Sequence, residues 1–151
     1  MRSVFLFVIG VTFAFAAVTA RAQTSDQEAA RVPLENYIKG HATGDGEYMK
    51  KAFHTEGDLI FIRDGKVTKR SFAEYIAGFT GKPAADEAKR KRTIESVDIF
   101  GNAGSGKIVL EYPDARIVDY MSLLKVNGEW KIVNKIFYTE RKTAPAAAKK
   151  P

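Results

Sequence analysis

The first half of the chain carries nonpolar and aromatic residues at the three- and four-residue intervals of a helix. Over positions 34–41 these are Leu34, Tyr37, Ile38 and His41. Ser25 and Glu28 precede the run with the spacing of a capping box, which marks the start of a helix. We therefore expect a helix from Ser25, which Pro33 should kink or restart because proline has no backbone N–H to donate.

Two shorter helices and a hairpin are expected next. Asp45 is a typical N-cap, and the apolar positions behind it are Tyr48, Met49, Ala52 and Phe53. Ser71 and Glu74 form a second capping box, for a helix that continues through Tyr75, Ile76 and Phe79. Between the two helices, Asp64-Gly65 separates the β-forming runs 59–62 and 67–68, which is a strong hairpin signal.

The second half of the chain changes to a two-residue period. Alternating apolar residues predict strands over residues 94–99, 108–112, 117–126 and 130–139, with turns at residues 101–104, 113–114 and 127–128. Helices followed by consecutive strands predict an α+β domain in which an antiparallel sheet wraps over the helices.

The last hairpin indicates a candidate site. A two-residue turn at Asn127-Gly128 places Asp119 and Asn134 on one apolar face of the sheet, together with Met121, Trp130 and Tyr138. A carboxylate on an apolar face is unfavourable unless it is paired or hydrogen-bonded. Asp119 therefore either holds the sheet in register through Asn134, Tyr138 or a water, or lies at the bottom of a ligand cavity.

Three segments carry a family resemblance: YIKGHATGDGEYMKKAFHTEGDLIF, the helix over residues 71–79, and DYMSLLKVNGEWKIVNKIFYTE. Together they resemble the NTF2-like superfamily, and within it the family called putative lumazine-binding. The resemblance extends from about Val32 to Glu140. It implies a cone-shaped α+β fold, in which a curved antiparallel sheet packs on three helices from the N-terminal half of the chain.

The resemblance also implies a pocket inside the cone and a homodimer formed through sheet faces. It does not imply a reaction, because the superfamily includes isomerases, cyclases, dehydratases, carriers and proteins of unknown role. The first hypothesis is a protein that binds a small, largely apolar or aromatic molecule. The alternatives are an isomerase, cyclase or dehydratase, and a non-catalytic dimeric module whose cone is filled by its own side chains.

Candidate residues follow from these hypotheses. An enzyme would use Asp119 as general base, with His54 or a tyrosine as acid. In the fold that the resemblance implies, His54 lies within reach of the sheet opening, and histidine has a near-neutral pKa. The residues expected to contact a ligand are Asn134, Tyr37, Tyr138, Trp130 and Met121. His41 is expected to face solvent.

The composition excludes several kinds of site and partner. The chain has no cysteine, which excludes disulfides, thiolate metal sites and a cysteine nucleophile, and its two histidines make a metal site improbable, so we expect no metal and no cofactor. The net charge is +6, and Lys89-Arg90-Lys91-Arg92 is the densest basic run. Aromatic residues do not alternate with that run, so nucleic acid is not an expected partner.

The N-terminus reads as an export signal. An apolar run over residues 4–18 is too short to span a membrane and precedes Ala20 and Ala22, the small residues that signal peptidase requires. We expect a signal peptide over residues 1–22, an NTF2-like domain over 23–140 and a disordered basic tail over 141–151. Removal of Arg2 and Arg21 lowers the net charge to +4. The mature protein, with no membrane span, should be periplasmic or secreted.

Export predicts a defined new N-terminus. Mass spectrometry of the protein purified from the exported fraction should find Gln23 as its first residue, because Ala20 and Ala22 occupy the −3 and −1 positions. A mature chain that retains residues 1–22 would contradict this prediction.

Overall fold

The fold is α+β, with one long helix lying across a curved sheet. The computed structural model describes residues 25–142. A helix over residues 25–43 is followed by α2 (Gly46–Ala52), β1 (Phe53–Arg63), β2 (Lys66–Ser71), α3 (Phe72–Ile76), the 3₁₀ turn η1 (Glu87–Lys89), β3 (Lys91–Phe100), β4 (Ala103–Glu111), β5 (Ala115–Val126) and β6 (Glu129–Arg141). Helices and strands thus follow the predicted order.

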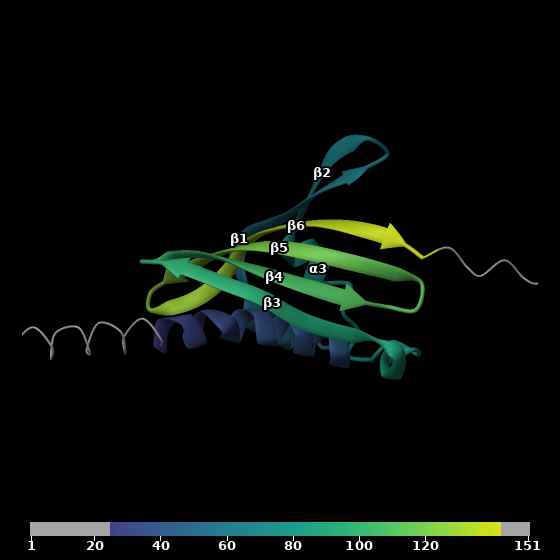
Figure 1. Ribbon diagram of the computed structural model, residues 1–151, viewed down its shortest axis with the longest axis horizontal. Helices are drawn as coiled ribbons and strands as arrows, with labels where there is room; N and C mark the ends of the chain where they lie inside the picture. The colour runs from purple at the N-terminus through teal and green to yellow at the C-terminus, as the bar shows by residue number, and fades with distance from the viewer. Residues whose placement is uncertain (1–24, 143–151) are drawn as a thin grey trace, which may run out of the picture.

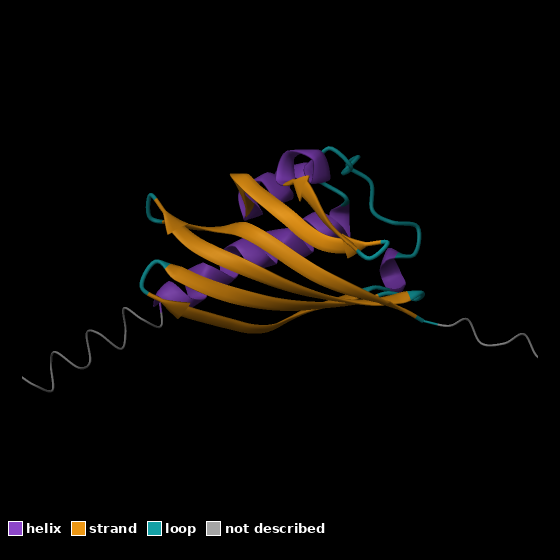
Figure 2. Ribbon diagram, turned by 90° about the horizontal axis from the view of Figure 1, so that it is seen from above, coloured by secondary structure: helices purple, strands orange, loops and turns teal. Residues whose placement is uncertain are grey.

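The six strands form one mixed sheet in the order β2-β1-β6-β5-β4-β3 (Figure 1). Every neighbouring pair is antiparallel, as expected, except β1 and β6, which run parallel. Figure 2 shows the long helix crossing the inner, concave side of the curved sheet.

The helix boundaries follow the local capping chemistry. The Asp45 side chain accepts from the backbone N–H of Glu47, and Ser71 and Glu74 form the predicted reciprocal capping box. Two details differ from expectation. The long helix continues through Pro33 without interruption, and the proline side chain is fully buried. Phe53 belongs to β1 rather than to α2.

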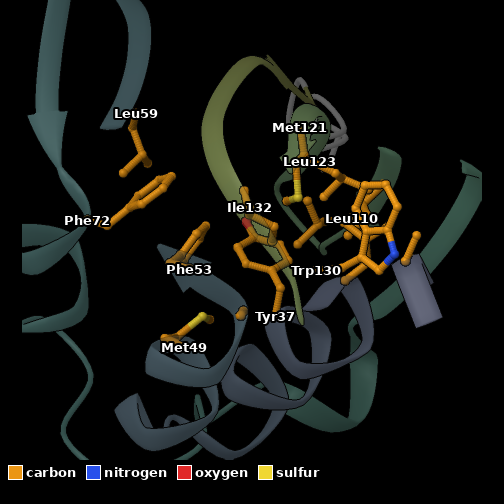
Figure 3. Close-up of a cluster of buried hydrophobic side chains, with 14 of the residues drawn as sticks. Tyr37, Met49, Phe53, Leu59, Phe72, Leu110, Met121, Leu123, Trp130 and Ile132 are labelled. Atoms are coloured by element: carbon orange, nitrogen blue, oxygen red, sulfur yellow. The ribbon is translucent and has the colours of Figure 1, made fainter. Parts of the chain in front are cut away.

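The core lies between the long helix and the concave face of the sheet. Figure 3 shows Tyr37 of the helix among side chains of the sheet, with Trp130 on one side and Phe53 and Phe72 on the other. The Phe53 and Phe72 rings stack with 3.9 Å between their centroids. The largest fully buried side chains of this core are Tyr37, Phe72, Leu34, Met49, Ile108, Leu110, Met121, Leu123 and Ile132.

The last hairpin contains a β-bulge that its turn does not reveal. Near the turn the pairing is the expected one, with Leu123 opposite Ile132. Beyond it Ser122 pairs with Asn134, so Val133 is an extra residue in β6. The side chains that follow Val133 therefore exchange faces, which corrects the predicted register.

Gly57 allows the close packing at this bulge. The β1–β6 pairing also shifts here, between Phe53 and Asp58. A Cβ atom at Gly57 would lie 2.2 Å from the Phe72 ring and 2.7 Å from the carbonyl oxygen of Val133. Only glycine fits between these groups, so the irregular segments of β1 and β6 pack directly against each other.

Several expectations concern the ends of the chain. The proposed signal peptide lies outside the described residues, as does residue 143 onward of the proposed tail. Arg141 still belongs to β6, and the Lys142 side chain donates to the carbonyl oxygen of Tyr112 at 2.7 Å. No helix within residues 25–142 is long and apolar enough to cross a membrane.

Candidate functional site

A cavity of about 280 Å³ lies between the long helix and the concave face of the sheet. Its apolar wall comes from β1, β4, β5 and β6. These residues are Leu59, Phe61, Leu110, Ile117 and Phe137. Its polar lining comes from the helices, from the sheet and from the segment before β3. These residues are Tyr37, His41, Arg63, Arg70, Tyr75, Arg90, Tyr112, Asp119 and Lys135.

Three buried polar side chains form the centre of this lining. Asp119 of β5 is fully buried and Lys135 of β6 is 4% exposed. The Lys135 ammonium donates to Asp119 Oδ1 at 3.1 Å and to the Tyr37 hydroxyl at 2.9 Å. The Tyr37 hydroxyl donates to Asp119 Oδ2 at 2.7 Å. Each carboxylate oxygen thus accepts one hydrogen bond, and the buried charge of Asp119 is paired.

Burial and the ion pair act on Lys135 in opposite directions. Burial lowers the pKa of the Lys135 amine, because the charged form loses its hydration, and the Asp119 carboxylate offsets only part of that effect. The pKa of the Tyr37 hydroxyl is raised, mainly by burial and then by the charge of Asp119. The cluster therefore holds a proton-bearing tyrosine beside a lysine that loses its proton more readily than an exposed one.

His41 and Tyr75 extend the cluster along the cavity wall. The Tyr75 hydroxyl lies 2.8 Å from His41 Nε2. Burial lowers the pKa of His41, and the nearby charges of Lys135, Arg92 and Arg90 lower it further. The expectation that His41 faces solvent is thus wrong. The long helix places His41 one turn beyond Tyr37, on the side that faces the sheet.

Arginines give the cavity a positive side. Arg90 donates to Asp86 at 2.8 Å, and Arg70 donates to the backbone carbonyl of Glu74 at 2.7 Å. Arg63 lies over the Phe61 ring at 5.2 Å and forms no ion pair with any of residues 25–142. The guanidinium of Arg63 is therefore available to an anionic group bound in the cavity.

Because of the bulge at Val133, two of the residues predicted to contact a ligand do not lie on the same face of the sheet as Asp119. Asn134 does not share a face with Asp119, because it follows the extra residue, and it donates to the carbonyl oxygen of Asp58 at 3.1 Å. Tyr138 lies on the opposite, convex face and is 74% exposed. Lys135 occupies the position that the predicted register gave to Asn134.

The other predicted residues separate into different environments. Tyr37 lines the cavity beside Asp119, as expected. Met121 and Trp130 lie on the concave face but belong to the packed core. The Trp130 indole N–H is buried and has no hydrogen-bond partner among the described residues.

His54 does not meet Asp119. It follows Phe53 in β1, and it is not among the residues that line the Asp119 cavity. His54 lines a second cavity, of about 450 Å³, whose wall includes Phe53, Phe72 and Ile76. His54 and Asp119 thus line different cavities, whereas Tyr37 and Tyr75 share a cavity with Asp119. No three metal-ligating side chains come together within the described part of the chain.

Sequence reasoning missed Lys135, Tyr75 and the three arginines. A signal for Lys135 was present in β6, where the buried positions Trp130 and Ile132 are followed by Lys135 and Phe137. This change from even to odd positions is typical of a bulge between them. The arginines come from separate segments, so their assembly follows only from the tertiary structure.

Residues 25–138 match the family described as "Putative lumazine-binding". The chain belongs to this family. Its fold is also shared with solved NTF2-like proteins. The predicted family and fold class are confirmed.

Two solved structures illustrate the likeness. An NTF2-like protein of unknown function from Shewanella baltica OS155 superposes with a TM-score of 0.69 at 26% identity, over 78% of this chain and 95% of the other. A second NTF2-like protein of unknown function, from Silicibacter pomeroyi DSS-3, has a TM-score of 0.66 at 22% identity, over 78% of this chain and 98% of the other.

A curated relative has a named activity. The protein named aldolase FrzH, from Cladobotryum sp., is 20% identical over 116 residues, which cover 77% of this chain and 93% of the relative.

The buried ion pair predicts a specific pattern of stabilities. Lys135→Met leaves the Asp119 carboxylate unpaired, and we expect it to lower the free energy of unfolding by about 3–5 kcal/mol. Asp119→Leu combined with Lys135→Met should lower it less than Lys135→Met alone, because no buried charge remains. Urea unfolding of the wild type, both single variants and the double variant measures the coupling. Losses that simply add would contradict an interaction between the two side chains.

Proposed function

We propose that the protein binds a small, largely apolar or aromatic molecule in the cavity lined by Asp119, Lys135 and Tyr37. The observation that carries this proposal is the composition of the cavity: an apolar wall from four strands surrounds a few convergent polar groups. Small-molecule sites have this character, and a volume of about 280 Å³ suits a compact ligand. The family description, with its reference to lumazine, also favours a flat heteroaromatic ligand.

The charges around the cavity refine the ligand class. Asp119 is already neutralised by Lys135, whereas Arg63 has no acidic partner within residues 25–142. Arg70 and Arg90 line the same cavity. A ligand with an aromatic body and an anionic or electron-rich group would place the body against Phe61 and Phe137 and its charge toward the arginines.

Two matched compounds test this proposal. Isothermal titration calorimetry should show that 2-naphthoate binds more tightly than 2-naphthalenemethanol, and Arg63→Gln should remove most of the difference. Ile117→Trp fills the cavity and should weaken both compounds by more than about tenfold, or ~1.4 kcal/mol. Val118→Trp is the control, because Val118 is the next residue of β5 and its side chain points to the opposite face.

Equal binding to wild-type protein and Ile117→Trp would place the compounds elsewhere and contradict the proposed site. The second cavity, beside His54, would then be the next region to examine.

An enzyme that removes a proton beside a carbonyl group is the second candidate function. The observation that favours it is the contact of Asp119 with two proton donors inside a cavity. Asp119 is suited to act as base, with Tyr37 or Tyr75 as the acid in place of His54. Isomerases, cyclases and dehydratases share this step, and so does an aldol reaction, the activity in the name of the relative from Cladobotryum.

Deuterium exchange tests this second function. The protein should accelerate deuterium uptake into the methyl group of 2-acetylnaphthalene in D₂O, followed by proton NMR. Asp119→Asn should reduce the rate by about 10²–10⁴-fold, because it removes the base. Asp98→Asn, on the exposed side of β3, should exchange at the wild-type rate. Exchange that persists in folded Asp119→Asn would exclude Asp119 as the base.

We also propose a homodimer formed through the convex face of the sheet, in a protein exported to the periplasm or secreted. Large apolar side chains are exposed on this face or at the adjoining β1–β2 hairpin. They are Ile62, Val67, Tyr120, Leu124, Ile136 and Tyr138. A patch of this kind on a folded chain favours contact with another protein surface.

The homodimer predicts a concentration-dependent mass. Light scattering after gel filtration should give twice the mass of the mature chain, and Ile136→Glu with Tyr138→Lys should give the monomer while thermal unfolding remains cooperative. Val32→Glu is the control, because Val32 is 50% exposed on the long helix, away from the sheet. A monomeric wild type at micromolar concentration would contradict the dimer.

A further inference from the structure

The Lys135 ammonium can donate one more hydrogen bond than it makes. Its Nζ carries three protons when charged, and two of them are directed to Tyr37 and Asp119. The third has no hydrogen-bond acceptor within residues 25–142. Because Lys135 lines the cavity, this third direction is available to a bound molecule.

The surroundings of Lys135 are those of a nucleophilic amine. The rings of Phe137, Tyr37 and Tyr75 lie 4.6, 5.1 and 5.3 Å from Nζ, so aromatic faces enclose the nitrogen on several sides. The titratable groups that face it are Asp119 from β5, Tyr37 and His41 from the long helix, and Tyr75 from α3. Lysines in apolar pockets of this kind are the ones that react with carbonyl groups.

A purely stabilising role for the Asp119–Lys135 pair does not explain its position in the cavity wall. A buried ion pair is often no more stabilising than a well-packed apolar pair of the same volume. An Asp119–Lys135 pair that served the fold alone would not need to lie in the wall of a cavity. The same pair beside an open space supplies an amine together with a group that can take and return its proton.

We infer that Lys135 forms an imine with an aldehyde or ketone bound in this cavity, with Asp119 as its proton acceptor and donor. This inference rests on the proposed binding function and names the chemical class of one ligand group. The aromatic or apolar body of the ligand would lie against Phe61 and Phe137, and its carbonyl carbon would face Nζ.

The step balances without an oxidant or a reductant. The Lys135 ammonium passes a proton to Asp119, and the nitrogen lone pair then attacks the carbonyl carbon. As this bond forms, the carbonyl oxygen receives the proton from Asp119. The nitrogen of the resulting adduct gives its extra proton to Asp119. The carbon–oxygen bond then breaks, the oxygen leaves as water with the proton from Asp119, and the nitrogen lone pair forms the C=N bond. The products are water and a protonated imine beside the Asp119 carboxylate.

Reductive trapping tests this inference on the wild-type protein. The purified protein is incubated at neutral pH with 2-naphthaldehyde and sodium cyanoborohydride, and tryptic peptides are mapped by mass spectrometry. We expect one naphthylmethyl group per chain, at Lys135, formed faster than at any other lysine. Burial lowers the pKa of the Lys135 amine and so raises its uncharged, reactive fraction. Excess 2-naphthalenemethanol, which cannot form an imine, should suppress the labelling of Lys135 but not that of surface lysines.

Variants provide the matched comparison. Lys135→Met should lose the fast labelling, and Lys125→Met should keep it, because Lys125 pairs with Asp26 outside the cavity. Should Lys135→Met fail to fold, the wild-type peptide map still decides. Binding of 2-naphthalenemethanol with no label at Lys135 would overturn the imine and leave the binding function intact. Absence of both binding and label would overturn both.

Discussion

The extra residue Val133 in β6 is the constraint on which the candidate site depends. Near the turn, β5 and β6 pair as a regular hairpin, with Trp130 and Ile132 facing the core. One added residue moves every later side chain to the other face, because side chains alternate along a strand. Lys135 and Phe137 thereby enter the concave side, opposite the long helix, and Tyr138 is turned to the convex surface. Gly57 makes this possible, since any larger residue would collide with Phe72 and with the Val133 carbonyl.

The resulting site holds charged side chains within an apolar cavity wall. Its apolar wall disfavours charge, yet it holds a carboxylate and an ammonium, each stabilised by the other and by Tyr37. Such a pair contributes little to stability compared with apolar packing, but it keeps an acid, a base and an amine within hydrogen-bond distance of one another in a space that admits a ligand. The binding and the catalysis proposed above therefore involve the same region. Both proposals rest on these three side chains, and they differ in whether the bound molecule offers a reactive carbonyl.

The NTF2-like fold separates two sheet faces that differ in what covers them. The concave face is occupied by the long helix and contains both the packed core and the Asp119 cavity. The convex face is left with large apolar side chains, among them Ile136 and Tyr138. Because residues of β5 and β6 alternate between these faces, a single pair of strands supplies the cavity lining and the proposed dimer surface. A change of register in this hairpin would disturb both at once.

The sequence by itself determined the order of helices and strands, the capping of α2 and α3, and both tight turns at Asp64-Gly65 and Asn127-Gly128. These features depend on local backbone preferences and on periodicity, which neighbouring residues specify. Only the tertiary structure decided that β1 runs parallel to β6, that Lys135 rather than Asn134 meets Asp119, and that His54 opens into a different cavity. These depend on a bulge at Val133 that no turn residue marks, and on the close contact of Gly57 with Phe72 and β6. Contacts between residues so distant in the chain arise from packing, not from local preference.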